Sequence, residues 1–382
     1  MEYRTLGKTG LRVSEIGFGG EWLERHDAAH SVALLKYAHD QGINILDCWM
    51  PDPKSRDIIG EAFVGCREDW YVQGHIGSTY QNGQYVRSRD MKYVRPAFED
   101  LLQRLHTDYI DLGMIHYIDS VDEWNRVMGG GEYLDYVKEL HAKGIIRHIG
   151  LSTHNPVIGK LAVETGFIEM ILFSINPAFD MRPATEDLDT MWEGYDQGLS
   201  GIDPERARFY QMCEEQNVGI TVMKGYFGGA LLDPERSPFG VAFTPVQLLH
   251  YALTRPGVAS VLVGYDGPEQ VDEAVSYETA TDDARDYASV IAGAPLHSYS
   301  GVCTYCGHCK PCPVDIDIAM VNKFYDLATA QSETPQSVLE HYKALDHRAS
   351  ECIGCKGCES RCPFGVEIAD RMRKAAALFE PE

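Results

Sequence analysis

The chain has 382 residues, and its 57 acidic residues outnumber its 34 Lys and Arg, which gives a formal net charge of −23. This balance argues against nucleic acid and anionic membrane surfaces as partners, because both carry negative charge. The chain lacks an apolar run of membrane-spanning length and begins with a polar segment unlike a signal peptide, so we expect a cytoplasmic protein with one large and one small domain.

Strand-like and helix-like segments alternate along the first three quarters of the chain, after a hairpin that turns at residues 7–10. The predicted strands are residues 13–20, 43–48, 70–76, 110–116, 145–152, 168–175, 218–224 and 258–263. The predicted helices are residues 29–40, 57–64, 91–105, 133–141, 157–165, 205–216, 246–253 and 269–275. Eight such units are what an α/β fold of the (β/α)8 TIM-barrel type requires, and an open doubly wound sheet is the alternative.

The barrel is predicted to span residues 1–277, followed by a linker at 278–300 and a small domain at 301–382. Between its two cysteine clusters the small domain is predicted to be helical, at residues 318–330 and 338–345. Eleven cysteines in a chain without a secretion signal indicate a reducing compartment.

Eight of these cysteines have the spacing of a bacterial ferredoxin that holds two [4Fe-4S] clusters. They read C-x2-C-x2-C-x2-C and C-x2-C-x2-C-x3-C, and a proline follows the last cysteine of each set. Three thiolates of one tight loop reach one cluster, and the pre-proline cysteine usually binds the other cluster. We therefore assign one cluster to Cys303, Cys306, Cys309 and Cys362, and the other to Cys352, Cys355, Cys358 and Cys312.

The alternatives for these cysteines are zinc sites and disulfides. Structural zinc prefers two separated pairs of ligands, and disulfides suit a secreted chain. One detail departs from the commonest ferredoxin spacing, because only Lys310 and Pro311 lie before Cys312, where three residues are usual. The number of ligands is intact, so two [4Fe-4S] clusters are the prediction.

Several segments of the predicted barrel resemble the aldo/keto reductase family, in particular a branch with a ferredoxin-like tail. They are residues 3–11, 13–14, 17–19, 47, 55, 59–62, 108–111, 116, 144–152, 223–224, 228–229, 264, 268–270 and 273. The resemblance covers essentially the whole chain. It implies an NAD(P)H-dependent carbonyl reductase built on a (β/α)8 barrel, with a catalytic tetrad of Asp, Tyr, Lys and His in which the Tyr donates the proton.

This chain departs from the tetrad at two positions. Asp47 and His116 match, but Asp52 occupies the Tyr position and His75 the Lys position. These four residues are the candidate catalytic set, and we expect them to meet at the C-terminal mouth of the barrel, where active sites of this fold lie.

The resemblance also implies contacts to a nicotinamide cofactor. The residues concerned are Ser152, Thr153, Asn176, Lys224, Gly264 and Gln270. The loop Tyr265-Asp266-Gly267 contains no Arg or Lys that could hold a 2′-phosphate, so NADH is favoured over NADPH.

Three chemical interpretations remain open, all with a small organic molecule as substrate. His75 replaces the Tyr–Lys pair as general acid while NAD(P)H reduces a carbonyl and His116 orients its oxygen. Alternatively, the clusters feed single electrons from ferredoxin or another electron-transfer protein to a substrate in the barrel. In the third, Asp47, Asp52, His75 and His116 bind a metal for an isomerase or lyase reaction.

Two further points bear on these interpretations. A further alternative is that the Asp and His residues are satisfied polar groups in an inactive site and that the clusters only stabilise the fold of the tail. His154 follows the fifth predicted strand on the side of the site, where it either contacts a ligand or packs.

Overall fold

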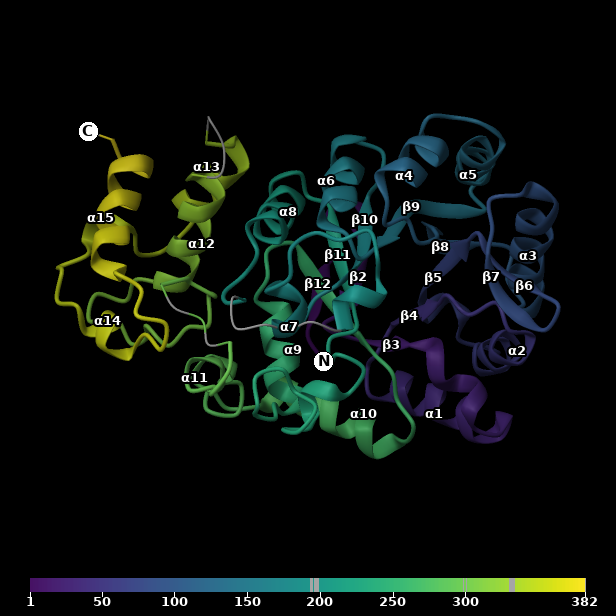
Figure 1. Cartoon of the computed structure of the whole chain (residues 1–382), viewed down its shortest axis with the longest axis horizontal. Coiled ribbons are helices and arrows are strands. Elements are labelled where there is room, and N and C mark those ends of the chain that lie inside the picture. Colours follow the sequence, from purple (N-terminus) through teal and green to yellow (C-terminus); the bar gives the residue numbers. More distant parts are fainter. Residues whose placement is uncertain (193–194, 196–198, 298, 300, 330–333, 382) are drawn as a thin grey trace.

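A closed barrel of eight parallel strands forms the centre of the computed structural model, which describes all residues except 193–194, 196–198, 298, 300, 330–333 and 382 (Figure 1). Around the barrel the strands follow the order β10-β11-β12-β3-β4-β5-β8-β9. They are β3 (Ile16–Gly19), β4 (Ile45–Cys48), β5 (Tyr71–Ile76), β8 (Ile110–Ile115), β9 (Ile146–Thr153), β10 (Met170–Ser174), β11 (Gly219–Met223) and β12 (Val258–Val263). The predicted TIM barrel is confirmed, and the open sheet is excluded.

Helices cover the outside of the barrel. They are α1 (Ala28–Asp40), α2 (Pro53–Ala62), α3 (Met91–Arg104), α4 (Val121–Met128), α5 (Glu132–Ala142), α6 (Pro156–Glu164), α7 (Pro177–Asp180), α8 (Pro204–Glu215), α9 (Pro245–Leu253) and α10 (Pro268–Val275). Six of them, α2 and α6 to α10, begin with a proline. Proline suits this position because its fixed φ is helical and the N–H it lacks would have no partner inside the helix.

The segment predicted as one strand at 13–20 is two strands. β2 (Arg12–Ser14) pairs with β1 (Tyr3–Thr5) in an antiparallel hairpin, and β3 then enters the barrel. The chain changes direction because the Ser14 hydroxyl donates to the carbonyl of Ile16 (2.6 Å) and the Ser14 N–H donates to Asn44 (2.8 Å). The hairpin turn packs against Gly219 at the start of β11, so this hairpin covers the N-terminal end of the barrel.

A second hairpin was not predicted from the sequence. It follows β5 and consists of β6 (Ser78–Gln81) and β7 (Gln84–Arg87), joined by Asn82 and Gly83. Both turn residues have positive φ, at 52° and 79°, as a two-residue type I′ turn requires. The hairpin therefore stands at the C-terminal end of the barrel, directly after β5.

The cysteine-rich tail lies at one side of the barrel (Figure 1). Its helices are α12 (Ile318–Thr329), α13 (Gln336–Lys343), α14 (Gly357–Arg361) and α15 (Ile368–Phe379). The segment predicted as a linker contains α11 (Tyr287–Ala292), in which Tyr287, Ala288 and Ile291 are buried. Ser298 and Ser300 in that segment, and Ala330 at the end of a predicted helix, lie outside the described residues. Within the described ranges, no helix is both long enough and apolar enough to span a membrane.

Buried polar contacts join the tail to the barrel. The guanidinium of Arg255 and the hydroxyl of Tyr287 both donate to the carbonyl of Thr304, which lies between the first two cysteines of the tail. On the surface, Lys323 of α12 pairs with Glu214 of α8 at 2.9 Å. The first cysteine loop is thus held against the barrel and does not hang on a free linker.

A substitution at Gly60 tests how closely α2 packs against the end of α3. A Cβ at Gly60 would lie 1.9 Å from the carbonyl oxygen of Arg104. We expect Gly60→Ala to lower the free energy of unfolding by about 1–3 kcal/mol, because backbone must move to relieve the overlap. The measurement is the urea midpoint.

The control for Gly60 is Gly267→Ala. There the new Cβ meets only the mobile carboxylate of Glu269, at 3.0 Å, so stability should change by less than about 0.5 kcal/mol. Equal midpoints for the two variants would contradict the close packing.

Candidate active site at the barrel mouth and the cysteine-rich tail

Three of the four predicted catalytic residues form a chain of hydrogen bonds. Asp47 lies on β4, His75 on the neighbouring β5, and His116 directly follows β8. His75 Nε2 is 2.8 Å from Asp47 Oδ1, and His75 Nδ1 is 2.8 Å from His116 Nδ1. All three side chains are buried, so the barrel presents them as one connected unit at its C-terminal end.

Asp52 has a different place. Its carboxylate accepts hydrogen bonds from the backbone N–H of Ser55 (3.0 Å) and from the Ser55 hydroxyl (3.3 Å), and so caps α2. This cap starts the helix four residues before the predicted start at residue 57. Asp52 is therefore explained by helix capping and is not a member of the Asp47–His75–His116 chain.

A tyrosine is the fourth member of the hydrogen-bonded chain that Asp47, His75 and His116 form. The hydroxyl of Tyr85, on β7, is 2.8 Å from His116 Nε2. Its ring stands perpendicular to Trp49, whose own ring lies parallel to His116. Tyr85 keeps 37% of its surface exposed, and burial of the rest raises the pKa of its hydroxyl. The hydrogen-bonded chain thus ends at Tyr85, a side chain that is partly open to solvent.

The pattern of strands and helices in the sequence does not place Tyr85, because no element is predicted for residues 77–90. A usable signal was present in Asn82-Gly83, the dipeptide most typical of a type I′ hairpin turn. It predicts a hairpin immediately after the strand that carries His75, and this places Tyr85 over the mouth.

The inner end of the chain is held by two polar residues. The side-chain Nε2 of Gln73 donates to Asp47 Oδ1 (2.9 Å), and the Thr221 hydroxyl donates to the side-chain Oε1 of Gln73 (2.7 Å). Gln73 and Thr221 are fully buried. Because each group has a fixed partner, the carboxylate of Asp47 is held in position toward His75.

When both histidines are neutral and Asp47 is ionised, the hydrogen bonds between these residues can have only one direction. His75 must donate from Nε2 to Asp47, so its Nδ1 accepts from Nδ1–H of His116. The Nε2 atom of His116 then accepts from the hydroxyl of Tyr85. Burial, and next the charge of a protonated His75, holds the pKa of His116 well below its usual range, which agrees with a neutral ring.

The residues predicted for the nicotinamide end of a cofactor are partly occupied by other contacts. Ser152 Oγ accepts from the N–H of Tyr117 (2.8 Å) and keeps its own proton to donate. The Thr153 hydroxyl donates to Asp119 (2.9 Å). Asn176 caps α7 and donates to the carbonyl of Lys224 (2.9 Å).

Lys224 fits an anionic group. It has φ +58° and is half-buried, and its ammonium lies 5.7 Å from the ring of Trp192. Burial lowers the pKa of Lys224, an effect that Glu21 and Asp119 partly offset. A partly desolvated ammonium of this kind gains most from a phosphate or carboxylate.

The side chains of Trp22 and Arg25 lie against the loop after β12. A Cβ at Gly264 would lie 2.3 Å from the indole of Trp22, and Arg25 stacks on the other atoms of that indole. Gln270 accepts from the N–H of Asp266 (2.6 Å), and so fixes the loop. Trp22 therefore lies against the loop that carries Gly264, and Lys224 and Ser152 are the residues here whose donors would suit the polar groups of a dinucleotide.

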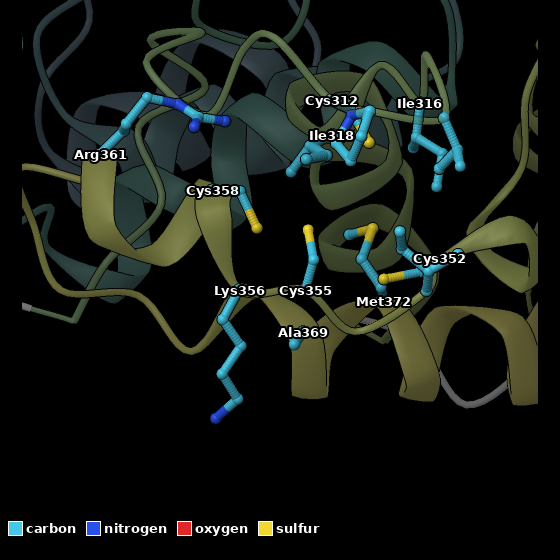
Figure 2. Close-up of a pocket in the computed structure, with 13 residues that line it drawn as sticks. Cys312, Ile316, Ile318, Cys352, Cys355, Lys356, Cys358, Arg361, Ala369 and Met372 are labelled. Carbon is cyan, nitrogen blue, oxygen red and sulfur yellow. The ribbon is translucent and has the colours of Figure 1, made fainter.

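Four cysteines line a small recess in the tail. Cys312 comes from the first set and Cys352, Cys355 and Cys358 from the second, and Figure 2 shows Cys355 and Cys358 directed into the same space. The rest of the lining is mainly apolar, from side chains such as Ile318 and Met372. Four thiols around an apolar recess have the chemistry that a [4Fe-4S] cluster needs.

A backbone contact joins the start of the first cysteine motif to the end of the second. The N–H of Gly301 donates to the carbonyl of Phe364 at 2.6 Å. Gly301 lies two residues before Cys303, and Phe364 lies two residues after Cys362. The last cysteine of the chain is therefore adjacent to the first loop, as the crossed ferredoxin pattern requires.

Comparison with known families agrees with both parts. Residues 15–181 match the aldo/keto reductase family, and residues 300–366 match the 4Fe-4S dicluster domain. The protein is an oxidoreductase of the aldo/keto reductase type with a 4Fe-4S dicluster domain. The resemblance seen in the sequence is thereby confirmed, including the ferredoxin-like tail.

Relatives of this aldo/keto reductase cover mainly the barrel. An uncharacterized oxidoreductase, YqkF of Bacillus subtilis (strain 168), is 26% identical over 296 residues, which are 73% of this chain and 92% of YqkF. The aldo-keto reductase YhdN of the same organism is 31% identical over 164 residues, 40% of this chain and 47% of YhdN. The holo form of aldo-keto reductase AKR11C1 from Bacillus halodurans has the same fold, with a TM-score of 0.58 and 23% identity over 75% of this chain and 94% of its own.

The crossed cluster pattern can be tested by removing one cluster and then single ligands of the other. A starting variant carries Ala at Cys303, Cys306 and Cys309, and should retain about four iron atoms per chain. Adding Cys362→Ala should leave that iron in place, whereas adding Cys312→Ala should remove most of it. The measurement is iron and sulfide content after anaerobic reconstitution. The reverse result would contradict the crossed assignment.

Proposed function

We propose that the barrel reduces the carbonyl of a small organic molecule, and that the chain Asp47–His75–His116–Tyr85 supplies the proton. The observation that carries this proposal is the 2.8 Å contact between the Tyr85 hydroxyl and His116 Nε2. It restores a tyrosine beside the histidine of the family tetrad, although this tyrosine comes from a hairpin and not from the usual position.

One additional proton reverses the hydrogen bonds that join His75, His116 and Tyr85, so that each donor becomes an acceptor. Placed on His75, it pairs with the Asp47 carboxylate, and His75 then donates from both ring nitrogens. His116 accepts at Nδ1 and donates from Nε2 to the oxygen of Tyr85. The hydroxyl proton of Tyr85 is thereby released from His116 and is free to point at a substrate oxygen.

The reduction consumes that proton. When bound, a reduced nicotinamide would supply the hydride, and with it both electrons, to the carbonyl carbon; the clusters would be an alternative source of the same two electrons, one at a time. Tyr85 gives its proton to the oxygen, Tyr85 takes one from His116, and His116 takes one from His75. The products are the alcohol and a hydrogen-bonded chain in which both histidines are neutral and Tyr85 again donates to His116. A proton from solvent, entering through the part-exposed Tyr85, then restores the additional proton on His75.

The geometry argues against the metal-assisted alternative. Asp47 and His116 bind opposite nitrogens of His75, so the three groups point along a line and not at one central point. A shared metal ion requires ligands that converge. Asp52, the fourth proposed ligand, is occupied as a helix cap.

NADH remains favoured over NADPH. The loop after β12 presents the exposed carboxylate of Asp266, which disfavours a 2′-phosphate nearby. Arg25, stacked on Trp22 beside the same loop, adds a positive charge, so we expect the preference to be modest.

Tyr85→Phe tests the proposed function. Loss of the hydroxyl should lower kcat for reduction of 4-nitrobenzaldehyde about 10²–10⁴-fold, the usual contribution of a general acid, with little change in KM. The assay is anaerobic, with NADH, NADPH or dithionite as separate reductants. Tyr80→Phe is the control, because Tyr80 lies on the same hairpin with 43% of its surface exposed.

Two outcomes would contradict the proposal. Equal rates for Tyr85→Phe and wild type with every reductant would exclude Tyr85 as the donor. An equal loss in Tyr80→Phe would show that the hairpin acts only by its shape. Turnover with dithionite but with neither nicotinamide would retain the proton chain and assign the electrons to the clusters.

A further inference from the structure

A second histidine–carboxylate pair lies at the mouth of the barrel, outside the chain described above. His154 follows β9, and its Nδ1 is 2.8 Å from Asp119 Oδ2. Asp119 also accepts, through Oδ1, from the N–H of His154 (2.7 Å) and from the hydroxyl of Thr153 (2.9 Å). The carboxylate is fully engaged, and it fixes the imidazole in one orientation.

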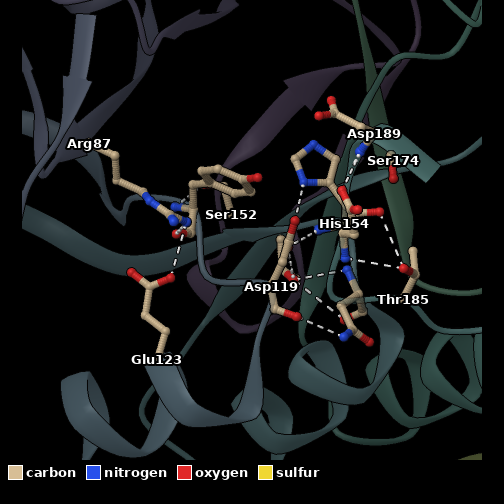
Figure 3. A network of polar contacts seen from close by, with 12 residues as sticks. Arg87, Asp119, Glu123, Ser152, His154, Ser174, Thr185 and Asp189 are labelled. Atoms are coloured by element: carbon tan, nitrogen blue, oxygen red, sulfur yellow. Dashed lines mark hydrogen bonds and ion pairs between the residues drawn. The ribbon is translucent and has the colours of Figure 1, made fainter. Parts of the chain in front are cut away.

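The remaining nitrogen of this imidazole has no hydrogen-bond partner among the described residues. Only 8% of the His154 side chain is accessible, and its Nε2 is buried. Figure 3 shows one ring nitrogen turned toward Asp119 and the other turned away from it. An unpaired buried polar atom costs free energy, so a native site that keeps one calls for an explanation.

Asp119 decides what Nε2 can bind. As an acceptor, its carboxylate keeps the proton of the neutral ring on Nδ1, so Nε2 presents a lone pair. Burial lowers the pKa of His154, an effect that Asp119 partly offsets, and the charges of Lys224 and Arg206 act in the same direction as burial. Burial thus favours the neutral ring, in which Nε2 is an acceptor without a donor among the described residues.

Tyr117 lies between this acceptor and the catalytic chain. Its ring centroid is 5.3 Å from that of His154 and 6.1 Å from that of His116. Tyr117 has φ +47°, a conformation that a non-glycine residue adopts at some cost and that is common at functional sites. His154 and His116 therefore both contact the ring of Tyr117, which places the two histidines on either side of one aromatic residue.

We propose that Nε2 of His154 accepts a hydrogen bond from a hydroxyl of the substrate, at some distance from the reacting carbonyl. The substrates are then hydroxy-carbonyl compounds and not simple ketones. This inference rests on the proposed carbonyl reduction and deepens it, because it names the second functional group of the substrate. A nicotinamide amide is the other donor that could fill this position, and the experiment separates the two.

The experiment compares matched ketones that differ by OH in place of CH3. The pairs are hydroxyacetone and butanone, 4-hydroxy-2-butanone and 2-pentanone, and 5-hydroxy-2-pentanone and 2-hexanone. In the wild-type holoenzyme at least one pair should show a kcat/KM ratio of about 10- to 100-fold in favour of the hydroxy compound, because the simple ketone leaves Nε2 unpaired. In His154→Phe this ratio should fall below about 3-fold.

Two more variants make the result specific. Asp119→Asn can donate to Nδ1, which moves the ring proton to Nε2 and turns the acceptor into a donor, so the hydroxy preference should be lost with the ring still in place. His148→Phe is the control, since His148 lies on the same strand and pairs with Glu169 at 2.9 Å, outside the site. It should keep the wild-type ratio.

Each outcome decides the proposal. Equal kcat/KM within every pair in the wild type, or a ratio that survives in His154→Phe, would overturn it. A raised KM for NADH in His154→Phe with an unchanged hydroxy preference would assign Nε2 to the cofactor and also overturn it. If no ketone is reduced, the proposed function fails, and saturation-transfer NMR of the same pairs then decides the inference by binding alone, with tighter binding of a hydroxy member in the wild type supporting it and equal binding refuting it.

Discussion

The contact between Nδ1 of His75 and Nδ1 of His116, at 2.8 Å, is the constraint on which the site depends. Two ring nitrogens at this distance share one proton, so the protonation of either ring fixes that of the other. Asp47 lies at one end of the pair and Tyr85 at the other. The four residues therefore act as a unit, and a proton added to His75 changes the direction of the hydrogen bond at the Tyr85 hydroxyl.

The barrel produces this contact by placing neighbouring strands in register. Asp47 on β4 pairs with Gln73 on β5, and His75 on β5 pairs with Met114 on β8, two residues before His116. Parallel strands of a barrel end at one rim, so side chains at these positions meet there. The hairpin after β5 then adds Tyr85 from above, and the second pair, Asp119 and His154, lies along the same rim.

The sequence predicted the barrel and the tail well, because strand and helix periodicity and cysteine spacing are local signals. It also brought Asp47, His75 and His116 together. It could not place Tyr85, which depends on how a hairpin folds over the mouth, although Asn82-Gly83 marked the turn. It assigned Asp52 to catalysis because position alone does not reveal that a carboxylate caps the next helix. The unpaired nitrogen of His154 is visible only once its neighbours are known.

Nitrogen NMR of the oxidised protein labelled with ¹⁵N-histidine, at pH 8, tests the central claim most directly. The account predicts that His116 carries its proton on Nδ1 and His75 on Nε2, with a scalar coupling between the two Nδ1 atoms across their shared hydrogen bond. Protons on Nε2 of both rings, with no coupling between the Nδ1 atoms, would contradict it, because such a pair cannot pass a proton from His75 through His116 to Tyr85.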